Sequence, residues 1–558
     1  MKSIRSRIVS LGAPSRRQAS KAPDTATPTT PTSSESPESA PVRRGSTVVN
    51  GDARHDTADW PSAVGLPIVS DPREERSDVI ATIRRFISQK WVADSPIVIL
   101  VIVYICYFSV ASLKLLAGRG YPSFDLAIFD QGVWLLGHFH DPFVTIIGRN
   151  LFGDHAQFIL IPVAFVARLF PEPEGLLVLQ WTFIGATAVP IYLTARKLTG
   201  SRVIATALGA AFLLNPTTQQ VNVMQFHPEC FLVFFIVTAV YAAIESRYVL
   251  LFVMVVLALL VKEDVAAMVV PLALWIYFRR DKKVGGQILG VAVGFALLDN
   301  FLLIPAFLGH PTIYTDRIPF GGFRGVIRTV IRSPGQFIAY LRADERPYYL
   351  WQMGFANGFG FLLAPEVAAI GVLVIIENVL SNNIYMHTST FWYSLPLVGL
   401  LSIGSAWAVG RQRTERRKNL VTVVVFVGAL WSCVLWGFAP FSNSRIYEGV
   451  DQQSAMFKAM TYVERGIPSN ASVSAYFIPW NTALDHRTQI YSWTNPFFDN
   501  AYGLPSQSGT RLPAANHVEY LVLPNPLPSG VDTTTFAAIS SDYHVVRSAG
   551  GWRLYKKN

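Results

Sequence analysis

Apolar segments of about 20 residues recur between residues 94 and 438, and polar loops separate them. The first is "DSPIVILVIVYICYFSVASLKLL" (94–116). Because a helix needs about 20 apolar residues to cross the hydrocarbon core, the pattern predicts an α-helical polytopic membrane protein. We expect eleven spans, at about residues 94–116, 176–195, 203–215, 229–244, 248–261, 265–278, 284–306, 347–363, 364–380, 392–409 and 420–438.

Three adjacent charges interrupt this apolar pattern at one point. The stretch "LFVMVVLALLVKEDVAAMVVPLALWIYF" (251–278) holds Lys262, Glu263 and Asp264 among residues that are otherwise apolar or small. A single helix over this stretch would be about 42 Å long at ~1.5 Å per residue, and the hydrocarbon core is only about 30 Å thick. We therefore expect two spans that meet at a charged turn on the extracytoplasmic side.

Composition and charge support the membrane assignment. Hydrophobic residues make up 51% of the chain and charged residues only 15%, whereas soluble domains carry about 25% charged residues. The net charge is +10, and basic residues lie beside apolar segments at 195–202, 278–283 and 411–419. This distribution is typical of cytoplasmic loops. The positive charge therefore points to the lipid bilayer as a partner and not to nucleic acid.

The patterns divide the chain into three regions. Residues 1–91 are rich in Ser, Thr, Pro, Ala and Arg, which predicts a disordered cytoplasmic tail. Residues 92–440 form a multi-pass domain in the plasma (inner) membrane, with a long first extracytoplasmic loop at 117–175. Within that loop, 156–170 is too short to cross and is expected near the interface. Residues 441–558 carry strand-like runs and predict a small extracytoplasmic α/β domain.

Under this topology an unusual set of ionisable residues shares the extracytoplasmic face. Taken singly, each has an ordinary explanation as a solvated loop residue, a helix cap or part of a turn. Together they indicate a common site, because ionisable groups at membrane depth are costly and often functional. The set consists of Asp125, Asp130, Arg149, His155, His227, Glu229, Lys262, Glu263, Asp264 and His387.

Five segments in this order are specific as a set: "FDLAIFDQ", "DHAQFILIPVAF", "FHPE", "KEDVA" and "NVLSNN". With the strand-like segments that close the chain, they resemble the bacterial membrane family catalogued as domain of unknown function 2079, over roughly residues 100–557. Gln157 departs from the pattern, in which a small residue and a proline follow the histidine. That family is similar in plan to the GT-C glycosyltransferases, which have many spans and a long first outer loop with a catalytic acidic residue.

The resemblance implies that a sugar is transferred from a polyprenyl-phosphate donor to an envelope glycan or protein acceptor. The acceptor hydroxyl needs a base, for which Asp125 is the first candidate and Asp130 the second. On a helix these two residues would point about 140° apart, so only a non-helical turn would bring both into one pocket.

The remaining candidates divide by charge. Cationic groups would stabilise the departing phosphate, and carboxylates would orient them, bind sugar hydroxyls or hold a possible divalent metal; no cofactor is otherwise implied. The cationic candidates are Lys262, Arg149, His155 and His227; the acidic ones are Glu229, Glu263 and Asp264; His387 completes the substrate-binding set.

Two other functions remain open. A transporter or lipid flippase would use the same charges as a substrate or proton path, but it should place some of them near the bilayer midplane and show internal repeats. A non-catalytic envelope assembly protein would use the outer domain to bind partners. It predicts that alanine at Asp125 or Glu263 leaves function intact.

Overall fold

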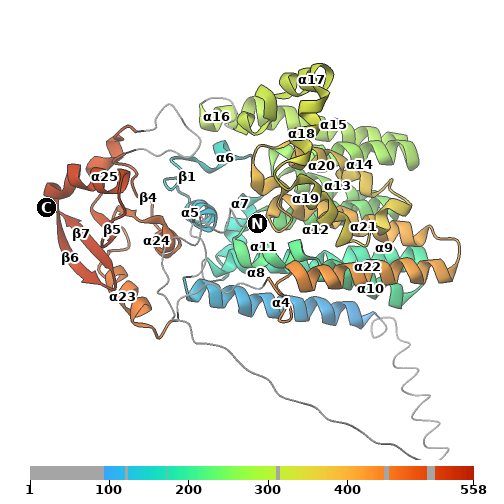
Figure 1. Cartoon of the computed structure of the whole chain (residues 1–558), viewed down its shortest axis with the longest axis horizontal. Coiled ribbons are helices and arrows are strands. Elements are labelled where there is room, and N and C mark those ends of the chain that lie inside the picture. Colours follow the sequence, from blue (N-terminus) through green and yellow to red (C-terminus); the bar gives the residue numbers. More distant parts are fainter. Residues whose placement is uncertain (1–93, 120–123, 171–172, 310–313, 445–450, 499–508) are drawn as a thin grey trace, which may run out of the picture. The chain divides into compact units, whose positions relative to one another are not determined.

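The computed structural model describes residues 94–119, 124–170, 173–309, 314–444, 451–498 and 509–558. The chain divides into two units, Met1–Pro72 and Arg73–Asn558, and every described residue belongs to the second. The predicted tail, 1–91, lies outside the described residues. The described part begins with a long series of helices and ends in a five-stranded sheet (Figure 1).

Five helices in the described ranges are long and apolar enough to cross a membrane. They are α4 (Ser95–Ala117), α8 with α9 (Glu174–Ala186, Ala188–Thr199), α15 with α16 (Lys282–Leu298, Ile304–Leu308), α21 (Leu395–Gly410, after a 3-10 turn at Trp392–Ser394) and α22 (Glu415–Trp436). Shorter apolar helices are α10 (Arg202–Leu214), α12 (Glu229–Ile244), α13 (Tyr248–Leu259) and α20 (Val372–Leu380). The fold is thus mostly helical, and the figure of eleven spans stays a prediction.

Helices α12 and α21 lie at the centre of this helical region. Almost every residue of both is buried. A helix can be apolar all round when other helices cover every side of it. The two pack closely at Gly399, where an added Cβ would lie 2.7 Å from the side chains of Val233 and Val237.

The charged stretch at 262–264 separates two helices, as the length argument predicts. Helix α13 ends at Leu259, and α14 (Ala266–Arg279) begins after a 3-10 turn at Glu263–Val265. Lys262 has an extended backbone between them. Helix α14 then packs extensively against α15. We call the segment Leu260–Val265 the elbow.

The structure differs from the expected spans at 347–363 and 364–380. Helix α19 (Arg346–Phe355) stops early, and only short 3-10 turns at Gly360–Leu363 and Ala368–Gly371 precede α20. Gly358 and Phe359 have positive φ values of 53° and 51°. Because a right-handed helix cannot continue through that conformation, α19 ends before Gly358, and the two helices of this run are shorter than the expected spans.

The first loop, predicted at 117–175, has a structure of its own. It contains a small hairpin and three helices, of which the last is too short to cross a membrane. The elements are α5 (Asp125–Gly137), β1 (Phe143–Val144), β2 (Arg149–Asn150), α6 (Leu151–Asp154) and α7 (Leu160–Ala167). Three further helices lie later in the chain: α11 (Pro216–Met224), α17 (Phe323–Arg332) and α18 (Pro334–Arg342).

The C-terminal strands form one mixed sheet in the order β4-β3-β5-β7-β6. Strand β3 is parallel to β4 and β5, whereas β7 is antiparallel to β5 and β6. The strands are β3 (Val473–Ala475), β4 (Ile490–Ser492), β5 (Tyr520–Pro524), β6 (Tyr543–Ala549) and β7 (Trp552–Lys557); the helices are α23 (Ala455–Glu464), α24 (Phe477–Leu484) and α25 (Val531–Ile539). All lie within 441–558, where we predict the α/β domain.

Close packing at Gly399 yields a test of the central helix pair. A Gly399→Val substitution forces two stiff β-branched side chains on α12 to move, so we expect a loss of about 1–3 kcal/mol in stability. The measurement is thermal unfolding of the purified protein in detergent. Gly294→Val on α15 is the matched control, because an added Cβ there meets no atom within 4 Å. Equal losses of stability for Gly399→Val and Gly294→Val would contradict the close packing of α21 against α12.

Candidate functional site

Asp125 is the first residue of α5, and neighbouring polar groups hold that end of the helix. The backbone N–H of Leu126 donates to Oε1 of Gln225 at 3.0 Å. Asp125 Oδ2 lies 3.5 Å from Nε2 of His227, and the Asp125 side chain is 27% exposed. This carboxylate is therefore both held in place and open to an incoming molecule.

Two consecutive aromatic residues connect this carboxylate to the elbow. The ring of His227 stacks on Trp392, with centroids 3.5 Å apart. The ring of the next residue, Tyr393, lies 5.6 Å from Nζ of Lys262. The 3-10 turn before α21 thus contacts the partner of Asp125 with one side chain and the elbow lysine with the other.

Lys262 lies at the centre of the elbow and is buried. Its Nζ lies 3.1 Å from Oδ2 of Asp264 and 3.4 Å from Oε1 of Glu229, the first residue of α12. Burial by itself would lower the pKa of Lys262, but Asp264, Glu229 and Glu263 outweigh it and raise that pKa well above its usual range. Lys262 therefore carries a proton throughout the physiological pH range.

Glu263 points to the first loop and not to Lys262. Its Oε1 lies 2.7 Å from Nδ1 of His155, and its Oε2 accepts from the backbone N–H of Ala156 at 3.1 Å. Burial would raise the pKa of Glu263, but the neighbouring His155 and Lys262 hold it well below its usual range. The elbow and the segment after α6 are thus joined by a charge-assisted hydrogen bond.

A second ion pair lies behind His155. Arg149 on β2 is buried and bonds Asp154 Oδ1 through Nε at 2.8 Å, and Tyr314 donates its hydroxyl proton to the same oxygen at 2.7 Å. The Tyr314 ring stacks on His155 at 4.7 Å. Burial opposes ionisation of Asp154, but His155, Arg149 and the Tyr314 hydroxyl lower its pKa overall. Arg149 is therefore engaged within the protein.

Most of the predicted set comes together. Contacts between described residues connect eight of its ten members through the elbow, the start of α5 and the segment at 154–156. We call these eight the elbow cluster: Asp125, Arg149, His155, His227, Glu229, Lys262, Glu263 and Asp264. A pocket of about 30 Å³ lies beside Lys262, lined in part by Glu229, Asp264, Glu377, Asn378 and Tyr393.

Two predicted residues lie elsewhere. His387 is buried near Arg346, where burial and that guanidinium lower the pKa of the imidazole. Asp130 lies in the same helix as Asp125, and its side chain meets a different partner. This is the divergence that helical geometry predicts for residues five positions apart.

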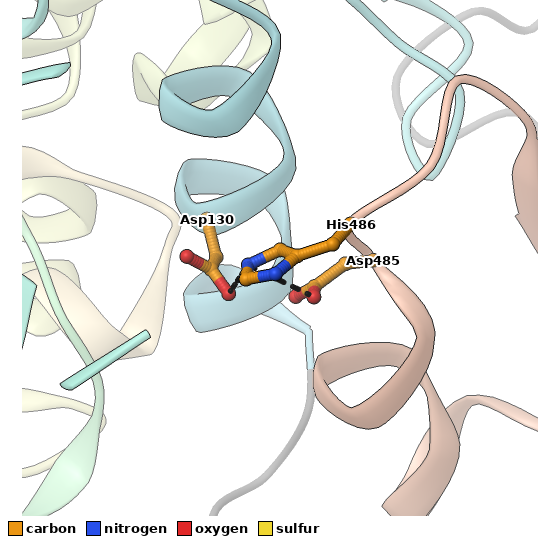
Figure 2. Close-up of side chains that lie close together, drawn as sticks. All are labelled: Asp130, Asp485 and His486. Atoms are coloured by element: carbon orange, nitrogen blue, oxygen red, sulfur yellow. Dashed lines mark hydrogen bonds and ion pairs between the residues drawn. The ribbon is translucent and has the colours of Figure 1, made fainter. Parts of the chain in front are cut away.

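The partner of Asp130 comes from the C-terminal sheet region (Figure 2). Oδ2 of Asp130 lies 3.1 Å from Nε2 of His486, and Oδ1 of Asp485 lies 3.9 Å from the same nitrogen. Burial and the nearby charge of Asp130 raise the pKa of Asp485 well above its usual range. Sequence reasoning did not find this contact, because 355 residues separate Asp130 from Asp485.

Sequence reasoning also missed two residues that help to connect the elbow cluster. Trp392 lies in an aromatic stretch at the start of an expected span, and Tyr314 lies in a segment with no recognisable motif. An aromatic residue gives no sign in sequence that its ring stacks on a histidine of another helix. Only the fold brings these groups together.

The family description "Predicted membrane protein (DUF2079)" matches residues 120–490, which is more than half of the chain. The chain belongs to this family. The matched range includes every member of the elbow cluster and the Asp130–Asp485–His486 contact. The resemblance noted from the five ordered segments is thereby confirmed. No curated protein sequence matches the chain significantly.

Solved structures show a weaker likeness. ArnT from Cupriavidus metallidurans bound to undecaprenyl phosphate is 10% identical, with 83% of this chain and 98% of that chain covered and a TM-score of 0.49. An oligosaccharyltransferase of Archaeoglobus fulgidus, tethered with an acceptor peptide, is 11% identical, with 84% and 75% covered and a TM-score of 0.45.

The low pKa of Glu263 predicts how stability depends on pH. A carboxylate with a depressed pKa contributes stability above its unfolded pKa, about 4.3, and loses it as the pH falls toward the folded value. Glu263→Gln should therefore lower the melting temperature at pH 7, at a cost of about 1–3 kcal/mol. The difference in melting temperature between wild type and Glu263→Gln should become smaller below about pH 4.5.

The measurement is thermal unfolding in detergent between pH 7 and 3.5. Glu415→Gln, which removes an exposed carboxylate on α22, is the control and should change little at any pH. If the difference in melting temperature between wild type and Glu263→Gln is the same at pH 7 and at pH 4, the ion pair between Glu263 and His155 is contradicted.

Proposed function

We propose that the chain is a membrane glycosyltransferase. It transfers a sugar from a polyprenyl-phosphate donor to an envelope glycan or protein acceptor at the extracytoplasmic face. The observation that carries this proposal is the pairing of a partly exposed, positioned carboxylate, Asp125, with a buried and permanently charged lysine in one cluster. Group transfer from a phosphate needs both a base and a cation.

Asp125 is the proposed base. As the acceptor hydroxyl attacks the anomeric carbon of the sugar, its proton passes to the Asp125 carboxylate. The bond between that carbon and the phosphate oxygen breaks, and its electron pair leaves with the polyprenyl phosphate. His227, 3.5 Å from Oδ2 of Asp125, keeps the carboxylate oriented. Trp392 in turn holds the imidazole by stacking.

Lys262 is the proposed electrostatic partner of the phosphate. Its charge is already shared with Glu229 and Asp264, so a phosphate must compete with these carboxylates. A pocket of about 30 Å³ holds roughly one water molecule, so the sugar lies over the elbow and not inside the pocket. Sugar hydroxyls that bond Glu229 and Asp264 would free Lys262 to face the phosphate.

The contacts of two arginines favour a different role for Arg149 and add Arg317 as a candidate. Arg149 bonds Asp154 and supports the loop, so it serves to position the site and not to bind phosphate. Arg317, whose guanidinium lies over the Tyr314 ring at 4.0 Å, is a better candidate for the phosphate. Its charge also acts on Glu377, which lines the pocket beside Lys262.

Removal of the base should abolish transfer. Asp125→Asn keeps the size of the side chain and removes its basicity, so we expect a loss of at least about 100-fold in transfer. The measurement compares envelope glycans and polyprenyl-phosphate sugars in a deletion strain that carries wild type or variant. The variant should lack the glycan and accumulate the donor.

Asp141→Asn is the matched control, because Asp141 is an exposed carboxylate of the same loop that bonds only the side chain of Asn150 among the contacts described. The transferase proposal would be contradicted if the deletion strain has the same glycans as the parent strain under conditions in which the parent strain expresses the protein. Activity retained by Asp125→Asn would contradict the role of Asp125 and favour the assembly-protein alternative.

The proposal requires the elbow cluster to face the extracytoplasmic side. Alkaline phosphatase fused after Asn558 should be active and green fluorescent protein at the same point dark, because only the first matures outside the cytoplasm. Fusions at residue 281, in a basic loop predicted to be cytoplasmic, should give the opposite pattern. Fluorescence of the C-terminal fusion would place Asn558 in the cytoplasm. That result would contradict the proposed topology, because the C-terminal domain could not then reach an external acceptor.

A further inference from the structure

Two buried carboxylates and an imidazole meet where α5 contacts the C-terminal sheet region. Asp130 comes from the middle of α5, and Asp485 and His486 directly follow α24. Figure 2 shows the imidazole between the two carboxyl groups. One ligand atom from each of the three residues lies within 4.8 Å of the other two.

The two carboxyl groups are incompletely satisfied. Asp130 is fully buried and Asp485 is 2% exposed. Within the part of the chain that the structure describes, no N–H or O–H donor bonds Oδ1 of Asp130 or Oδ2 of Asp485. Buried carboxylate oxygens are normally hydrogen-bonded or bound to a cation. Both open oxygens belong to groups within reach of the same imidazole nitrogen.

Two neighbouring arginines donate to other groups. Arg487 follows the pair in sequence, but its guanidinium donates to the backbone carbonyls of Leu484, Pro468 and Ala471. Arg168, at the edge of the neighbouring pocket, donates to the carbonyl of Gly137. Among the described residues, neither arginine adds positive charge at these two oxygens. The imidazole of His486 contacts both carboxyl groups, and a bound ion would supply further positive charge.

We propose that Asp130, Asp485 and His486 bind a divalent transition-metal ion of the Zn²⁺ class. Two carboxylate oxygens and one imidazole nitrogen form a mixed donor set that suits such ions better than Ca²⁺ or Mg²⁺. With bond lengths near 2.0–2.1 Å, tetrahedral ligands lie about 3.3 Å apart. The observed separations from His486 Nε2, 3.1 and 3.9 Å, lie on either side of that value.

A path to solvent leads to the same place. His486 is 35% exposed and lines an open pocket of about 290 Å³ with His138, Arg168 and Phe170. The Trp134 ring stacks on His486 at 6.1 Å and restricts its orientation. A metal ion would enter through this pocket, and solvent from it would fill the fourth coordination position.

The ion would join two parts of the chain that already share hydrogen bonds. Gln131, next to Asp130, donates to the carbonyl of Arg487 at 3.1 Å, and the N–H of Ile490 donates to Thr145 at 3.0 Å. The first of these contacts joins the residues that directly follow Asp130 and His486 in sequence. The metal therefore fixes the C-terminal segment to α5, which also carries Asp125. This inference does not depend on the proposed transferase activity.

Metal content of the purified full-length chain tests the proposal. The protein in detergent is stripped with EDTA, equilibrated with ZnCl₂ at about 10 μM, passed through gel filtration and analysed by mass spectrometry for zinc. We expect wild type to hold about one equivalent more than Asp485→Asn or His486→Gln. Zinc should also raise the melting temperature of wild type by several degrees and leave both variants unchanged.

Controls separate this site from other metal binding. Asp542→Asn and His544→Gln alter exposed residues near the C-terminus and should retain the wild-type zinc content. Asp485→Asn and His486→Gln lie near β4 and would also lose zinc if they impaired folding of the sheet. Asp130→Asn removes the ligand on α5 and leaves that region unchanged, so it should lose the same zinc equivalent for lack of a ligand alone. Equal zinc in wild type and all three ligand variants, or none in wild type, would overturn the proposal.

Discussion

The burial of Lys262 at a break between two helices is the constraint on which the site depends. An ammonium group removed from water is stable only beside negative charge, and here Asp264 and Glu229 supply it. That requirement draws the first residue of α12 to the elbow. Glu263, one position along, bonds the first loop instead. Three consecutive charges thus join α12, α14 and the loop that carries His155.

The parts of the fold that could be predicted from sequence are those set by length and periodicity. A stretch of 28 residues with charges near its middle exceeds the thickness of a bilayer core, and the structure divides it at the elbow. The expected divergence of Asp125 and Asp130 follows equally from helix geometry. The two helices in the run at 347–380 are shorter than the expected spans, because hydropathy does not reveal the positive φ values at Gly358 and Phe359.

The site was predictable in its charged residues and not in its contacts. Charges stand out in an apolar sequence, so every member of the elbow cluster could be named. The stacking of His227 on Trp392 and the approach of His486 to Asp130 join residues 165 and 356 positions apart. Such contacts depend on how helices pack. The side chains that make them are aromatic or buried, and they resemble ordinary core residues in sequence.

Helix α5 holds Asp125 at one end and Asp130 five residues further on, a rise of about 7.5 Å. A short helix moves as a rigid unit, so a tilt of the helix at Asp130 also changes the position of Asp125. The region after α24 and the proposed base are therefore mechanically coupled over a few ångströms. A displacement of the C-terminal strands would therefore change the orientation of the Asp125 carboxylate relative to His227.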